Sequence, residues 1–187
     1  MKSITGILLA TVVVFMWGFL FWGTPVFSFV FEVGKESPDE TAARAALKEH
    51  FPEDGLYFVP SAKHDMEERE KLHKEGPVAF VYMAEHDGGP MLNPKMMGMG
   101  FGVMLITNII LFVLIKVSCS SDSFFVTRFL VVFIAGLAAA VCNHGGDAVW
   151  WMQPLLWKSY QAFYQIVEWS ISGAILGWFT GKKKTKS

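Results

Sequence analysis

Four apolar segments, each near or above the length that crosses a bilayer, constrain this chain more than any other feature. They cover approximately residues 1–32, 94–117, 124–142 and 157–180. About 20 apolar residues suffice for a hydrocarbon core of about 30 Å. The first segment is too long for a signal peptide, and no Ala-x-Ala-like cleavage site follows it, so we expect an uncleaved anchor. The sequence therefore predicts an α-helical membrane protein with four transmembrane helices.

The distribution of charge predicts the topology of these helices. Residues 32–95 carry eight basic and fourteen acidic side chains, a net charge of −6. The two ends and the connection between the second and third helices, with the adjoining helix ends, carry seven basic side chains against Asp122 alone, and the tail 182–187 is strongly basic. Under the positive-inside rule both termini are cytoplasmic, and the insert between the first two helices lies on the opposite side, in the periplasm or exterior.

The insert, residues 33–92, has the sequence pattern of a small α+β unit. Its predicted order is helix, strand, helix, strand, with helices at 37–50 and 65–74 and strands at 56–59 and 78–83. We expect Ser37 to cap the first helix and Pro38 to occupy its first position. About 60 residues are marginal for independent folding, so we expect the insert to lean on the membrane helices or on a partner.

The last apolar segment carries one polar stripe. Gln161, Gln165 and Glu168 recur at steps of three and four residues, together with Lys158 and Ser172, and therefore share a helix face. An intramembrane carboxylate is costly and marks a functional-site hypothesis. Three roles stay open for Glu168: a buried contact with Asn108 at similar depth, part of a water-filled path for a proton or small solute, or a docking point for a neighbouring subunit.

Residues 93–181 form the predicted three-helix transmembrane region. Small residues at four-residue spacing predict close packing between its helices. The positions concerned are Gly98 and Gly102 in the second helix, Gly136 in the third, and Gly173 and Gly177 in the last. By contrast, no residue pattern indicates catalysis, a metal site or a cofactor site. His144 and Asp147 are two candidate ligands without a third, which is a weak metal site. We also expect no disulfide, because Cys119 and Cys142 fall at opposite ends of the third helix.

Several short motifs resemble a loose family of uncharacterised small bacterial inner-membrane proteins with four helices and an extracytoplasmic insert. The resembling residues are Trp17-Gly18, Gly55-Leu56-Tyr57-Phe58-Val59-Pro60, Gly76-Pro77-Val78-Ala79-Phe80-Val81 and Ile175-Leu176-Gly177-Trp178. The resemblance implies the bacterial inner membrane as the location. It implies no activity and transfers no site residue.

These features predict a non-catalytic accessory or structural subunit of a larger membrane complex, with the lipid bilayer and other membrane subunits or further copies of the chain as its partners. The alternative is a small oligomeric carrier or proton-coupled module that uses the polar stripe around Glu168. A membrane enzyme would have only His144, Asp147 and Glu168 as candidates. The net charge of −1 provides no basic field for nucleic acid.

Overall fold

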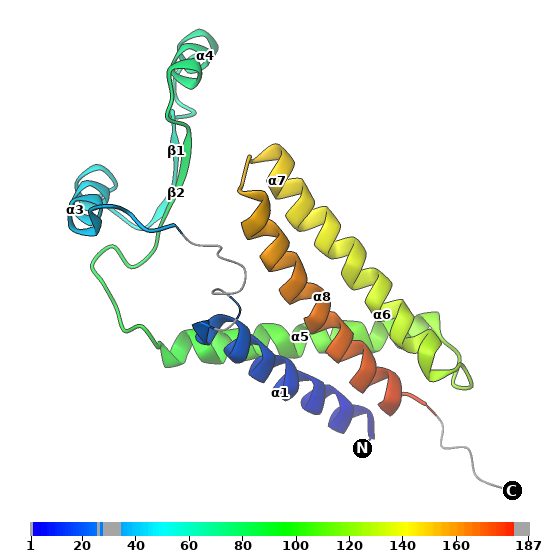
Figure 1. The fold of residues 1–187 in the computed structure, drawn as a ribbon. Coiled ribbons are helices and arrows are strands. Elements are labelled where there is room, and N and C mark those ends of the chain that lie inside the picture. Colours follow the sequence, from blue (N-terminus) through cyan, green and yellow to red (C-terminus); the bar gives the residue numbers. More distant parts are fainter. Residues whose placement is uncertain (1, 26, 28–34, 182–187) are drawn as a thin grey trace, which may run out of the picture. The chain divides into compact units, whose positions relative to one another are not determined.

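The computed structural model describes residues 2–25, 27 and 35–181, which are mostly helical (Figure 1). The chain divides into two compact units. One unit combines the N-terminal part with the chain from Pro94 onward, and the other covers Glu36–Asn93. We describe each unit by itself.

The first unit consists of long apolar helices. They are α1 (Lys2–Gly23), α5 (Pro94–Ser118), α6 (Phe125–Ala140), the short α7 (Gly146–Trp150) and α8 (Leu155–Phe179). Three helical stretches are long and apolar enough to cross a membrane: α1, α5 and the continuous helix Phe125–Trp150. They support a multi-pass membrane protein. The 25-residue α8 is not among the three, because polar side chains lower its hydropathy.

The helix after the second connection is longer than predicted. The sequence predicts its end at Cys142 and a loop over residues 143–147, and this is wrong. A single π-helical turn, η1 (Val141–Gly145), continues α6 directly into α7. Gly145 and Gly146 therefore lie within helical structure rather than in a loop. Helix α1 ends at Gly23, and residues 1, 26 and 28–32 of the predicted first segment lie outside the described residues.

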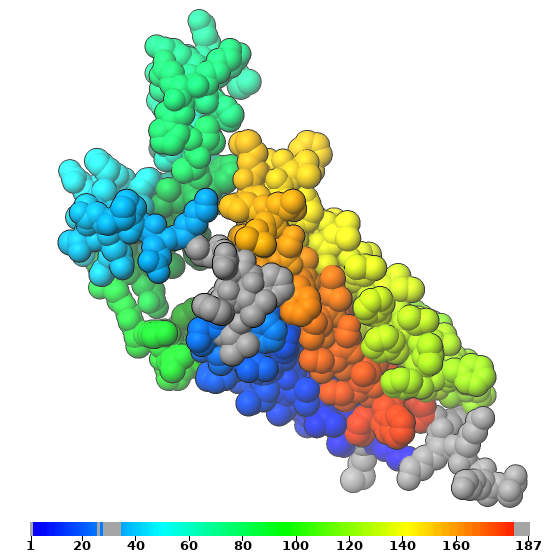
Figure 2. All heavy atoms as spheres, viewed as in Figure 1, coloured from blue at the N-terminus to red at the C-terminus, as the bar shows by residue number. Residues whose placement is uncertain are grey.

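Helix α8 is central to the packing of this unit, because it contacts α6 on one side and α1 on the other (Figure 1). In the space-filling view α6 and α8 touch over much of their length (Figure 2). Helix α5 packs mainly on α1. A buried cluster joins all four helices through Ala10, Leu111, Ile115, Val132 and Leu176.

The second unit contains α3 (Glu40–His50), β1 (Gly55–Val59), α4 (Met66–Glu75) and β2 (Ala79–Met83), which confirms the predicted order of elements. The strands are antiparallel, with Leu56 opposite Tyr82 and Phe58 opposite Phe80. The predicted cap of α3 is wrong: Asp39, not Ser37, accepts a hydrogen bond of 2.9 Å from the Ala42 N–H. No residue of 36–93 is buried, so this unit has no core of its own.

Candidate functional site

The polar stripe of α8 meets charged and polar side chains from the end of the preceding helix. Lys158 Nζ lies 2.8 Å from Asp147 Oδ2 of α7, and it donates a 2.6 Å hydrogen bond to Gln161 Oε1. Lys158 is only 6% exposed. A buried ammonium is costly unless it is paired, and the contact with Asp147 offsets the cost of burying Lys158.

One turn further along α8, the stripe contacts the π-helical turn. His144 Nε2 lies 2.9 Å from Gln165 Oε1, and because that oxygen can only accept, Nε2 is the donor. The other ring nitrogen, Nδ1, is buried and has no hydrogen-bond partner among the described residues. A π turn inserts one residue into the helical register and so changes the direction of the side chains that follow it. Here His144 and Asp147 both contact α8.

The contacts of His144 and Asp147 differ from those of a metal site. Each side chain pairs with a different residue of α8 rather than with the other. Within residues 2–25, 27 and 35–181, no group of three or more His, Cys, Asp or Glu side chains is placed to hold a metal ion. We define the polar network as His144, Asp147, Lys158, Gln161 and Gln165.

Glu168 follows this network toward the middle of α8. It is partly buried, and across the described part of the chain its side chain has no hydrogen bond or ion pair. The predicted contact with Asn108 is not formed as a hydrogen bond: Asn108 Nδ2 donates to the Met104 carbonyl of its own helix at 3.0 Å. The amide oxygen of Asn108 has no hydrogen-bond partner among the described residues, and the residue is only 1% exposed.

The neighbours of Asn108 in α5 and of Glu168 in α8 show where these two residues lie in the packing. One turn before them, Met104 and Tyr164 both approach Gly18 of α1, within 3.3 Å and 3.1 Å of where its Cβ would lie. Beyond them, Leu111 and Leu176 belong to one buried cluster. Residues four apart share a helix face. The two polar side chains therefore lie between two regions where the helices meet.

Aromatic rings join α1 to the N-terminal half of α8. The Phe21 ring is fully buried and stacks on Tyr160 at 4.4 Å between centroids, and the Tyr160 hydroxyl donates to the Phe21 carbonyl at 3.3 Å. The Trp17 indole N–H donates to the Tyr164 carbonyl at 3.4 Å. These contacts pack α1 against the same part of α8 that carries Lys158, Gln161 and Gln165.

Arg128 of α6 is a second buried cation, only 5% exposed. Its guanidinium donates to the Gly177 carbonyl at 3.3 Å and to the Ser121 carbonyl at 3.0 Å. These contacts bind the end of α8 to the connection before α6. The sequence does not predict this role, because an arginine near a helix end is expected to extend its side chain to the membrane surface.

The predicted packing glycines have two different environments. A Cβ at Gly136 would lie 2.7 Å from the Trp169 Cβ, and one at Gly173 would lie 3.1 Å from the Val132 Cβ. Gly177 similarly faces Arg128 and Phe129 at 3.4–3.5 Å. These three glycines let α6 and α8 approach closely. In contrast, a Cβ at Gly98 or Gly102 would meet no atom within 4 Å.

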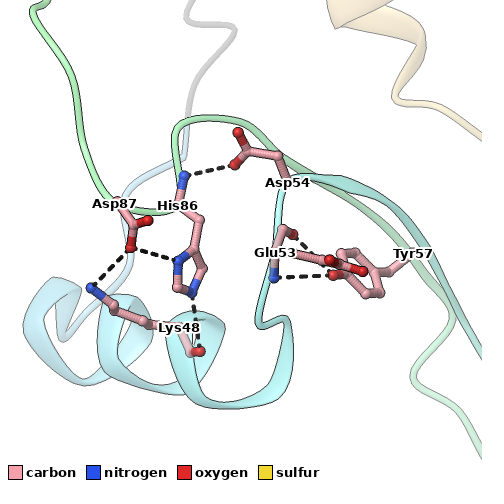
Figure 3. Close-up of polar contacts among 6 residues, drawn as sticks. All are labelled: Lys48, Glu53, Asp54, Tyr57, His86 and Asp87. Carbon is pink, nitrogen blue, oxygen red and sulfur yellow. Dashed lines mark hydrogen bonds and ion pairs between the residues drawn. The ribbon is translucent and has the colours of Figure 1, made fainter.

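In the insert, a separate group of polar contacts surrounds His86 (Figure 3). Its backbone N–H donates to Asp54 Oδ1 at 2.7 Å, and its ring nitrogens lie 3.1 Å from Asp87 Oδ1 and 3.4 Å from the Lys48 carbonyl. A cavity of about 430 Å³ lies between α3 and the loop after β2. The ion pair of Lys48 and Asp87 is exposed, and such pairs contribute little stability. We interpret this group as the contact that holds the loop on α3.

Comparison with known proteins adds no relative. No family model, no curated protein and no solved structure matches this chain. Functional inference therefore rests on the site itself.

Proposed function

We propose that this chain is a non-catalytic, four-span protein of the bacterial inner membrane that acts as an accessory or structural subunit of a larger membrane complex. Its termini are cytoplasmic, and its insert faces the periplasm or exterior. The fourth span is α8, and the destinations of its polar side chains support this role. Lys158 and Ser172 are buried in the bundle, and Trp178 is exposed. Polar groups that face protein are compatible with a membrane span.

The proposal is supported most directly by the exposed apolar surface on the first half of α5. The buried residues of this 25-residue helix are Asn108, Leu111 and Ile115, all in its second half. The first half exposes large apolar side chains and has the open positions Gly98 and Gly102. Small residues allow two helix backbones to approach closely in lipid, so this surface suits a helix of another subunit or a second copy.

Purification from the native membrane in a mild detergent tests the proposal. We expect a defined assembly larger than the 20.9 kDa chain. The double substitution Gly98→Val and Gly102→Val should release the other subunits. Gly100→Val is the matched control, because position 100 is also open but lies about 200° around the helix from each of them. A monodisperse single chain, or equal behaviour of both variants, would contradict the proposal.

The second candidate is a small oligomeric carrier or proton-coupled module. Glu168 favours it, because a partly buried carboxyl without a hydrogen-bond partner among the described residues is available to exchange a proton. Proton flux into vesicles that contain the chain distinguishes the two functions. Flux that is lost in Glu168→Gln would support the carrier, and flux no greater than in empty vesicles would exclude it.

A further inference from the structure

The antiparallel hairpin of the insert has one continuous apolar face. The pairing of β1 and β2 places Leu56 opposite Tyr82 and Phe58 opposite Phe80. These four side chains alternate with their neighbours and therefore project from the same side of the sheet. We call them the hairpin face. Their exposed fractions are 56%, 78%, 40% and 40% in the order named.

This face is not covered by the rest of the insert. The rings of Phe58 and Phe80 contact each other edge to face at 5.2 Å, and yet both remain exposed. An isolated two-stranded sheet is at best marginally stable in water. Since no residue of 36–93 is buried, the insert requires an external apolar surface.

We propose that the hairpin face lies on the lipid bilayer, with its side chains in the interfacial region of a zwitterionic leaflet. The chemistry of the strands supports this occupant, because none of the ten residues of β1 and β2 is charged. Tyr and Phe beside Leu are side chains that suit the boundary between headgroups and acyl chains.

The chain connections also favour the bilayer over a soluble partner. Ten residues connect Met83 to the start of α5, so the end of β2 is tethered to a span by at most about 36 Å of extended chain. Tethering gives a weak surface contact a high effective concentration. Met91 and Leu92, which are also exposed, add apolar side chains shortly before α5, and Glu85 and Asp87 lie between them and β2.

The charge of the insert selects the kind of leaflet. Residues 36–93 contain six basic and thirteen acidic side chains, a net charge of −7. Most of this negative charge lies outside α3 and α4. It repels anionic headgroups, and two copies of the insert would repel each other. An uncharged lipid surface avoids both costs.

Fluorescence quenching in phosphatidylcholine nanodiscs tests this proposal with the full chain. In a Cys119→Ser/Cys142→Ser background, Tyr82→Cys places an environment-sensitive dye on the hairpin face. Lys71→Cys places the same dye on the exposed side of α4 as a control. Lipids that carry a nitroxide on the acyl chain should quench the dye at position 82 about threefold more than the dye at 71. Replacing a third of the lipid with phosphatidylglycerol should reduce that difference.

Labelling of the unmodified chain covers the case in which the dye disturbs the hairpin. A photoactivatable carbene on the lipid acyl chain should modify the peptides that contain β1 and β2, and should leave the peptide of α4 unmodified. Equal quenching at positions 82 and 71, together with no carbene adduct on the strands, would overturn the proposal. A dye at 82 that is shielded from water but not quenched, in a particle with two copies, would assign the face to a second copy instead.

Discussion

At the scale of single residues, the structure shows which polar groups of the membrane unit are satisfied. Lys158 and Arg128 are buried cations with close partners, whereas Glu168 has none among the described residues. This contrast separates residues that hold helices together from one that is chemically available. Substitutions should therefore have unequal effects along the same helix face.

Breaking the ion pair between Lys158 and Asp147 should destabilise the membrane unit. We expect Lys158→Met to lower the free energy of unfolding by about 1–3 kcal/mol, less than for a fully buried pair because Asp147 is partly exposed. The double variant Lys158→Met/Asp147→Leu should recover part of that loss. Equilibrium unfolding in mixed micelles measures both values. Additive losses in the double variant would show that the ion pair does not couple the two residues.

Glu168 should tolerate an apolar substitution better than its neighbour on the stripe. Glu168→Leu removes no hydrogen bond, so we expect the free energy of unfolding to change by less than about 0.5 kcal/mol. Gln165→Leu leaves His144 without its 2.9 Å partner and should cost about 1 kcal/mol. The same unfolding measurement compares them. A larger loss for Glu168→Leu than for Gln165→Leu would indicate a contact that the described geometry does not contain.

At the scale of elements, the contact between α6 and α8 depends on three glycines, whereas the glycines of α5 are open. The sequence alone could not separate these two groups, because four-residue spacing indicates a packing face but not what packs on it. Helix α8 illustrates the same limit. Its polar stripe was predictable from periodicity, but the partners of the stripe were not. The partners lie in η1 and α7, where the Gly145-Gly146 pair led to the prediction of a loop.

A side chain at a closed glycine should disrupt the α6–α8 contact. In Gly173→Val the new Cβ would lie 3.1 Å from the Val132 Cβ and 3.3 Å from the Phe129 carbonyl oxygen, which belongs to the backbone and cannot move aside easily. We expect a loss of about 1–3 kcal/mol from overpacking. Gly98→Val, at an open position, should leave the stability of the isolated chain nearly unchanged. Thermal unfolding in detergent compares the two, and equal melting temperatures would refute this assignment of the closed glycine.

At the scale of the whole molecule, much of the architecture was predictable. Hydropathy indicated the three helices that are long and apolar enough to cross a membrane, and alternation indicated the two strands, because both signals are local. The pair Asp147–Lys158 was not predicted, although the signal existed: opposite charges flank a short turn that contains Pro154. The other contacts of the site could not be predicted. Which side chains of two helices meet depends on how each helix is rotated about its own axis, and periodicity does not determine this rotation. The absence of any buried residue in 36–93 also could not be predicted from the sequence and was seen only in the structure.

The proposed topology can be tested with cysteines in intact cells. In a Cys142→Ser background, a membrane-impermeant maleimide should label Lys63→Cys in the insert without permeabilisation. Native Cys119, in the predicted cytoplasmic connection, should be labelled only after the cells are opened. Gel-shift analysis of the labelled chain measures both. The reverse pattern would invert the topology and place the insert inside the cell.

The π-helical turn determines which side of the helix Asp147 occupies. The turn holds one residue more than an ordinary α-helix would, so Asp147 takes the direction that position 146 would have in an uninterrupted helix. If Val141–Gly145 became α-helical at constant length, every residue after it would rotate by about 100° relative to α6, and Asp147 would turn away from Lys158. Deleting one residue from the turn would remove the extra residue, and a regular helix would then keep Asp147 on the side of α8. Insertions should therefore be tolerated less well at this turn than a deletion of one residue.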